Sequence, residues 1–186
     1  AFIPMRANKL SEQDKKQALN SLIFVTEKKN KDIKTRQCID RSPQRQYIKK
    51  EGAAAPTVAT ESILIRAAID AHEGRDTVTL DLPGAYLDTN LTDKWVVMGF
   101  KKRLCKLLVA VISLLYRSYV MVDKNGDSIF YMHLQKALYV LLCSALLFYL
   151  KLIGELEAYG FKLNPYDPCM ANMIDNGNQI TATWHV

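Results

Sequence analysis

The sequence has few of the residues that build metal centres or disulfide frameworks. Its 186 residues include four cysteines and three histidines. The cysteines are widely spaced, contain no Cys-x-x-Cys pair and have no histidine partner: Cys38, Cys105, Cys143 and Cys169. This spacing argues against a structural zinc site and against a disulfide-stapled fold. We therefore expect reduced, buried thiols in an intracellular protein.

Long hydrophobic runs are also missing. The apolar stretch Leu104–Leu115 contains Lys106 and is far shorter than the roughly 20 residues of a membrane span, so we expect it in a protein core. No secretory signal peptide is visible. We expect a protein of the cytoplasm or nucleus that is not secreted and has no membrane partner. Because the first methionine is Met5, we also expect residue 1 to lie inside a longer polypeptide.

The net charge of +6 is concentrated at the N-terminal end. Residues 1–51 carry 13 Lys and Arg against 6 Asp and Glu, whereas residues 52–186 carry 12 against 13. A basic segment on a near-neutral body fits a phosphate-rich partner such as a nucleic acid. On charge alone it fits a solvated, partly flexible face slightly better, and the charge count leaves both interpretations open.

The N-terminal region is predicted to hold one helix and one hairpin. Ser11 is a good helix N-cap with acidic residues in the first turn behind it. The apolar residues of Ala18–Val25 then predict a buried face on the same helix. The basic stretch that follows contains two short β-rich runs, Ile33–Ile39 and Gln46–Ile48, which we expect to pair as a hairpin.

The rest of the chain alternates helices with hairpins. A helix opening at Thr57 or Thr60 repeats its apolar residues at helical spacing up to Gly74, and two Asn-Gly dipeptides indicate tight hairpin turns. The other expected elements are strands at Arg75–Asp81 and Asp93–Val97, a helix at Lys102–Tyr116, hairpin strands at Tyr119–Val122 and Ile129–Leu134, a helix at Gln135–Tyr159, and hairpin strands at Cys169–Ile174 and Gln179–Val186. This mixture predicts an α+β fold, which we divide into residues 1–55 and residues 56–186.

Asp81 is the most informative single residue. It closes the expected β-run Arg75–Asp81, and an aromatic residue, Tyr86, follows five positions later. A carboxylate at the end of a strand is a suitable ligand for a hard cation such as Mg²⁺. The competing interpretations are structural: Asp81 as a turn carboxylate before Pro83, and Tyr86 as an ordinary core side chain.

Several blocks of the sequence together carry a family resemblance. They keep the same order and a similar spacing over roughly residues 30–186: KTR at Lys34–Arg36, APTV at Ala55–Val58, TLDLPGAYL at Thr79–Leu87, LQKALY at Leu134–Tyr139, YGF at Tyr159–Phe161, NPYDPC at Asn164–Cys169 and WHV at Trp184–Val186. Taken together they resemble the reverse transcriptase of copia-type retrotransposon polyproteins. The resemblance implies fingers in residues 1–55 and further fingers and palm in residues 56–186.

The resemblance implies RNA-directed DNA polymerase chemistry, in which two divalent metals activate the primer hydroxyl and hold the triphosphate. Asp81 would be a catalytic Mg²⁺ ligand. Its partner aspartates would follow Val186, so we expect this chain to be a truncated, divergent fragment without activity of its own.

Other implied roles concern the substrates. Lys34 and Arg36 would grip the incoming triphosphate from one face of a fingers strand, and Tyr86 would pack under the nucleotide sugar and exclude a 2′-hydroxyl. Implied partners are an RNA/DNA primer–template, deoxynucleotide triphosphates, and the integrase and ribonuclease H modules of the polyprotein.

Two residues depart from the family pattern. After Tyr139 the family has Gly and, three residues on, Gln, whereas this chain has Val140 and Cys143. Three hypotheses therefore stand: an inactive reverse transcriptase fragment, a nucleic-acid-binding relic without catalysis, and an unrelated α+β interaction domain.

Overall fold

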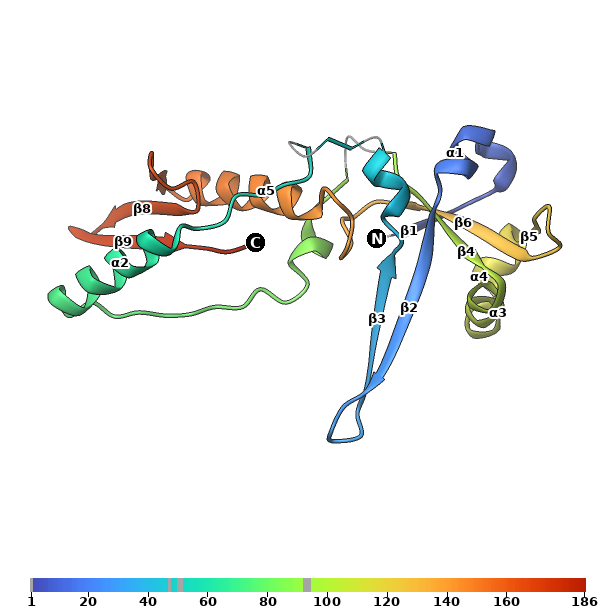
Figure 1. Cartoon of the computed structure of the whole chain (residues 1–186), viewed down its shortest axis with the longest axis horizontal. Helices are drawn as coiled ribbons and strands as arrows, with labels where there is room; N and C mark the ends of the chain where they lie inside the picture. Colours follow the sequence, from blue (N-terminus) through green and yellow to red (C-terminus); the bar gives the residue numbers. More distant parts are fainter. Residues whose placement is uncertain (1, 47, 50–51, 92–94) are drawn as a thin grey trace. The chain divides into compact units, whose positions relative to one another are not determined.

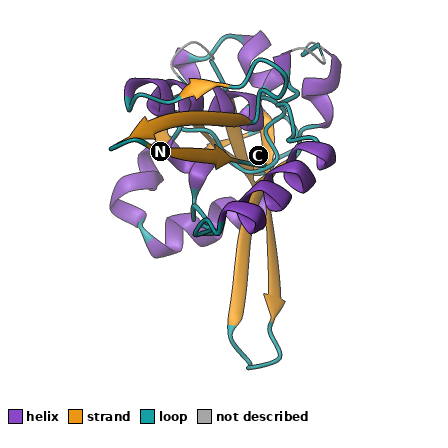
Figure 2. Ribbon diagram, turned by 90° about the vertical axis from the view of Figure 1, so that its left-hand side faces the viewer, coloured by secondary structure: helices purple, strands orange, loops and turns teal. Residues whose placement is uncertain are grey.

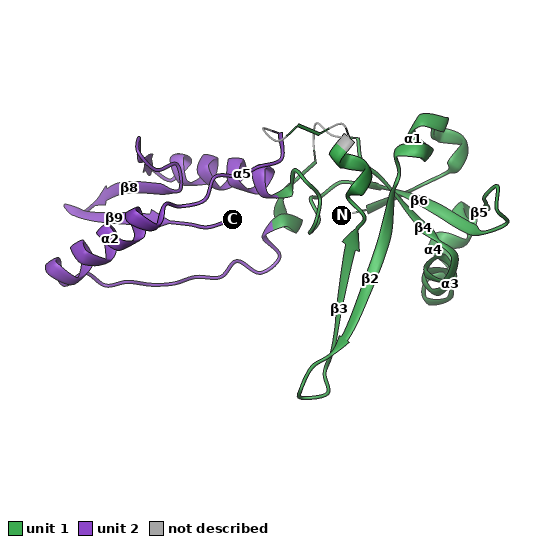
Figure 3. Cartoon of the chain, in the orientation of Figure 1, with its two compact units in different colours: residues 1–49, 86–144 green, residues 50–85, 145–186 purple. Residues whose placement is uncertain are grey.

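The computed structural model describes residues 2–46, 48–49, 52–91 and 95–186 of the chain. Helices and strands are mixed, as expected for an α+β protein. The chain forms two compact units, each built from two separate stretches (Figure 3): unit 1 holds Ala1–Lys49 and Tyr86–Ser144, and unit 2 holds Lys50–Ala85 and Ala145–Val186. The division at residue 55 stays a prediction about the sequence.

Unit 1 is organised around a six-stranded sheet in which neighbouring strands follow the order β1-β6-β4-β2-β3 and β5 pairs with β6 (Figure 1). All pairs are antiparallel except β2 with β4. The strands are β1 (Phe2–Met5), β2 (Leu19–Glu27), β3 (Ile33–Ile39), β4 (Val97–Lys101), β5 (Met121–Val122) and β6 (Ser128–Leu134). Part of its core is a cluster of Leu10, Val97, Ile129 and Tyr131.

Short helices complete unit 1. The α-helices are α1 (Glu12–Gln17), α3 (Lys102–Val111) and α4 (Ser113–Tyr116), and the 3₁₀ helices are η1 (Ala7–Lys9), η2 (Ser42–Gln46), η4 (Ala85–Asp88, whose first residue belongs to unit 2) and η5 (Arg117–Tyr119).

Unit 2 combines two longer helices with a small sheet. The helices are α2 (Thr60–Glu73) and α5 (Ser144–Ala158), and the antiparallel sheet has the order β7 (Lys162–Leu163), β8 (Met170–Asp175), β9 (Asn178–Thr183). Arg66 on α2 binds Asp70 through Nε, at 2.8 Å to each carboxylate oxygen, and donates from Nη1 to the Thr181 carbonyl of β9 at 3.1 Å. This contact fixes α2 against the sheet.

The prediction of one helix from Ser11 through Val25 is wrong beyond Gln17. Ser11 does form a capping box with Asp14, but the helix ends at Gln17 and the apolar run that follows is strand β2. β-Branched and aromatic residues favour a pleated strand, and pairing of β2 with β3 and β4 satisfies its backbone groups. Tertiary pairing therefore overrides the apparent helical spacing.

The predicted partner of Ile33–Ile39 is also wrong. This run is strand β3, but it pairs with β2. Of the expected partner Gln46–Ile48, Gln46 ends η2 and Tyr47 lies outside the described residues. The segment after β3 turns into η2, where the Asp40 carboxylate accepts a hydrogen bond from the Ser42 amide and the ring of Pro43 fixes a helical φ. The hairpin is consequently formed with the preceding strand.

The strand expected at Arg75–Asp81 is not formed. This segment has no ladder partner among the residues that the structure describes, and Val78 and Leu80 are each 81% exposed. A strand is stabilised by a neighbour that accepts its backbone hydrogen bonds, and local β-propensity alone does not supply one. The short strand expected at Asp93–Val97 begins only at Val97, and its Asp93 and Lys94 lie outside the described residues.

The remaining helix predictions need smaller corrections. The helix expected at Lys102–Tyr116 breaks at Ile112 into α3 and α4, and much of its apolar surface is exposed, with Leu114 fully so, instead of lying in a core. α5 starts at Ser144 and not at Gln135. None of the helices in the described residues is long and apolar enough to cross a membrane.

Candidate nucleotide and nucleic-acid interface

The β2–β3 hairpin carries two of the residues predicted to bind a nucleotide. Figures 1 and 2 show it extending beyond the rest of the unit 1 sheet. In its antiparallel register Lys34 lies opposite Thr26, and Arg36 lies opposite Phe24. Directly opposed residues share a face of the sheet, and so do residues two positions apart on one strand. Lys34, Arg36 and Phe24 therefore present one exposed face, as the alternation of the two cations predicted.

The chemistry of this face suits phosphate. None of the ion pairs found in the described part of the chain involves Lys34 or Arg36, so their charges are not neutralised by a carboxylate. The hairpin from Leu19 to Ile39 holds five cations against two anions, with three of the cations in and beside the turn: Lys28, Lys29 and Lys31. A guanidinium binds phosphate oxygens in pairs, and an exposed aromatic ring can stack on a base.

Tyr86 lies in unit 1 on η4 and is half-buried. Its ring packs edge-on against the ring of Tyr139, with centroids 4.9 Å apart and planes at 71°. This contact is what the structural interpretation of Tyr86 expects. The role beneath a nucleotide sugar stays a prediction.

Asp81 belongs to unit 2, whereas Lys34 and Arg36 belong to unit 1. Its side chain is exposed in the segment that forms no strand. Among the described residues, no three His, Cys, Asp or Glu side chains gather closely enough to hold a metal ion. The role of Asp81 as a Mg²⁺ ligand therefore stays a prediction, and we derive no catalytic step through a metal.

The two departures from the family pattern have different structural settings. Val140 has a φ of +78°, a region that costs an L-residue with a branched side chain roughly 1–2 kcal/mol and that glycine adopts freely. Cys143 is fully buried in unit 1 and lines a pocket. Val140 therefore introduces local backbone strain, and Cys143 places a thiol where the family pattern has a glutamine carboxamide.

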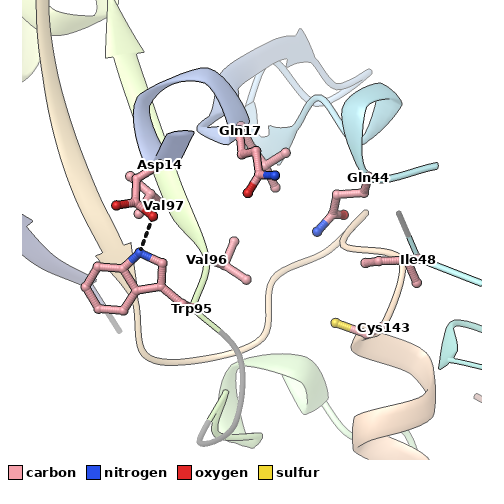
Figure 4. Close-up of a pocket in the computed structure, with 9 residues that line it drawn as sticks. Asp14, Gln17, Gln44, Ile48, Trp95, Val96, Val97 and Cys143 are labelled. Atoms are coloured by element: carbon pink, nitrogen blue, oxygen red, sulfur yellow. Dashed lines mark hydrogen bonds between the residues drawn. The ribbon is translucent and has the colours of Figure 1, made fainter. Parts of the chain in front are cut away.

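The pocket at Cys143 was not predicted from the sequence (Figure 4). It has a volume of about 280 Å³ and lies wholly within unit 1, between α1, η2 and the start of β4. Its lining residues are Asp14, Gln17, Leu19, Gln44, Ile48, Trp95, Val96, Val97 and Cys143. No sequence motif signals this pocket, because its residues come from four separate stretches of the chain.

Hydrogen bonds and stacking fix one wall of this pocket. The Trp95 indole donates to Asp14 at 3.1 Å, and its ring lies 4.1 Å from the ring of His133. Hydrogen bonds from the Ser11 hydroxyl and amide, and then from Trp95, lower the pKa of Asp14. Burial lowers the pKa of His133. The wall therefore combines an ionised carboxylate with a neutral ring stack at neutral pH.

The block NPYDPC has a structural role in unit 2. The Asp167 carboxylate accepts hydrogen bonds from the Ala59 amide at 3.0 Å and from the Cys169 amide at 2.9 Å, so it caps α2 from a distant loop. Asn164 shapes that loop by accepting from the amides of Tyr166 and Asp167. Burial acts to raise the pKa of Asp167, but hydrogen bonds from the Ser62 side chain and the two amides outweigh it and leave the pKa lowered.

Comparison of the chain with known protein families, with curated proteins and with solved structures finds no match.

Proposed function

We propose that this chain is a fingers and partial palm fragment of a copia-type reverse transcriptase, an RNA-directed DNA polymerase, and that it binds nucleic acid without catalysing synthesis by itself. The observation that carries the proposal is the shared face of Lys34, Arg36 and Phe24 on an exposed hairpin. Cations paired with an aromatic ring on one strand face are typical of single-strand nucleic-acid contacts.

Each side chain has a distinct task in this proposal. Arg36 makes paired hydrogen bonds to phosphate oxygens, and Lys34 adds a point charge two residues away. Phe24 offers its ring to a base and is 55% exposed, so the ring is accessible without rearrangement. Tyr86 would contact the nucleotide sugar, and Mg²⁺ at Asp81 would belong to the complete polymerase.

A nucleic-acid-binding relic is the second candidate. The strained Val140 and the thiol of Cys143 favour it, because both positions depart from the pattern that the resemblance sets. It shares the hairpin contact with the first candidate. It differs in that it assigns no polymerase activity even to the complete protein. An unrelated interaction domain would not need the hairpin cations at all.

The test is the affinity of the 186-residue chain for a primer–template at several salt concentrations. We expect the Lys34→Ala/Arg36→Ala variant to bind roughly tenfold or more weakly, because each charged hydrogen bond contributes about 1.5–3 kcal/mol in a well-formed contact. Loss of two phosphate contacts also lowers the slope of log affinity against log salt by about 2. Fluorescence anisotropy measures both quantities.

The matched control is Arg103→Ala/Lys106→Ala, which removes the same charge from exposed positions on helix α3 of unit 1, outside the hairpin. It should leave the affinity within about twofold and the slope almost unchanged. Equal weakening by both double variants would mean that only net charge matters. A salt-independent affinity would support the unrelated interaction domain and contradict the proposal.

A further inference from the structure

The pocket at Cys143 is lined by a side-chain amide, that of Gln44, whose NH₂ group has no hydrogen-bond partner among the described residues. Gln44 is 1% exposed, and its Oε1 accepts from the Leu142 amide at 3.3 Å. The Nε2 atom of Gln44 donates no hydrogen bond to any residue that the structure describes. Figure 4 shows this nitrogen pointing into the pocket. Because polar groups of a nearly buried side chain are usually hydrogen-bonded, the natural partner of this NH₂ group is an acceptor placed inside the pocket, on a ligand or a water.

The other polar groups of the pocket restrict what that acceptor belongs to. Gln17 supplies a second carboxamide, which offers both an oxygen and an NH₂ group, and Figure 4 shows it facing the same space. Asp14 supplies the carboxylate of the wall. Among the residues that the structure describes, none that lines the pocket is Lys or Arg. A phosphate or carboxylate is therefore disfavoured, and an uncharged ligand with both an acceptor and an N–H is favoured.

The apolar walls set the size and shape. Leu19, Val97 and Cys143 are almost fully buried, and Ile48 and Val96 complete the apolar lining. A cavity of about 150 Å³ holds benzene, and this pocket offers about 280 Å³. The space suits a fused two-ring molecule and is large enough for roughly nine waters at about 30 Å³ each.

We propose that this pocket binds a small, uncharged, planar cyclic amide, whose carbonyl accepts from Gln44 Nε2 and whose N–H donates to the carboxamide oxygen of Gln17. The site is separate from the hairpin and does not depend on phosphate recognition. Cys143, which departs from the family pattern, is one of the residues that line this pocket.

The probes are oxindole, a bicyclic lactam, and indane, the same bicycle without the amide. In amide-resolved NMR of the 186-residue chain, oxindole should shift the side-chain NH₂ resonances of Gln44 and Gln17 and the indole N–H of Trp95 along a saturable curve. Indane should bind at least tenfold more weakly, because it leaves the Gln44 donor unpaired.

Three variants make the test specific. Gln44→Met removes the donor at nearly constant volume and should weaken oxindole roughly tenfold. Gln17→Ala, at an exposed position, should weaken oxindole binding about threefold. It replaces Gln44→Met as the test if that variant does not fold. Gln13→Met is the matched control on the same helix outside the pocket, and should change nothing.

The contrary results are equally clear. Equal affinity for indane and oxindole would mean an apolar cavity without amide recognition. Absence of saturable shifts would mean that the pocket holds water only. Oxindole binding that neither Gln44→Met nor Gln17→Ala weakens would place the ligand elsewhere. Each of these overturns the proposal.

Discussion

Asp70→Asn is expected to lower the free energy of unfolding by about 3 kcal/mol. Asp70 is 7% exposed, and both its carboxylate oxygens accept from Arg66 Nε, while Arg66 Nη1 donates to the Thr181 carbonyl. Asparagine keeps the shape but leaves the guanidinium without a counter-charge in a largely desolvated place. Breaking one side of a buried pair costs about 3–5 kcal/mol, and the partial exposure of Arg66 places this pair at the low end.

Urea unfolding followed by circular dichroism measures this effect. The control is Glu73→Gln, which removes the carboxylate of an ion pair with Arg75 at the end of the same helix, where the carboxylate side chain is 48% exposed against 9% for Asp70. Exposed pairs contribute about 0–1 kcal/mol, so the control should change stability little. Equal effects of the two substitutions would show that the Arg66–Asp70–Thr181 contact does not hold α2 to the sheet.

Asp167→Asn is expected to lower the free energy of unfolding by about 2 kcal/mol. The carboxylate accepts from two backbone amides at once, those of Ala59 and Cys169. Asparagine keeps only one acceptor atom and turns an NH₂ group toward the other amide, so one buried donor loses its partner. Unfolding in urea at neutral pH measures the loss, and Asp175→Asn, at an exposed carboxylate of unit 2, is the matched control.

The same group gives a pH dependence of known sign. The pKa of Asp167 is lowered in the folded protein, so the unfolded chain binds the proton more readily. Its contribution to stability is fully present above about pH 4, the unperturbed pKa of an aspartate, and is lost as the pH falls through the lower pKa of the folded state. Asp167→Asn should flatten this acid-side loss. If the variant lost stability at low pH as the unmodified chain does, the capping role of Asp167 would be contradicted.

Local signals in the sequence predict the elements that are defined by local chemistry. The helix α2 ends at Gly74, as expected, where the backbone adopts a φ of +64° that glycine tolerates. The two Asn-Gly turns close the hairpins β5–β6 and β8–β9 as expected. The common face of Lys34 and Arg36 follows from strand alternation alone.

The elements that depend on distant partners were not predictable in this way. β2 is a strand because β3 and β4 pair with it, although its residues repeat at a spacing that also suits a helix. Arg75–Asp81 has strand-forming residues but no neighbour in the described structure. Gln44 and Cys143 meet only when η2 packs against the Leu142–Cys143 segment of unit 1, so no local motif in the sequence could predict the pocket.

Photo-crosslinking tests the central claim most directly. A primer–template carrying 5-iodouracil in the template strand is irradiated with the 186-residue chain, and the crosslinked peptide is identified by mass spectrometry. The account predicts crosslinks within the β2–β3 hairpin, centred on Phe24 and strongly reduced by Lys34→Ala/Arg36→Ala. Crosslinks confined to residues outside 19–39, or a hairpin crosslink that the double variant leaves unchanged, would contradict it.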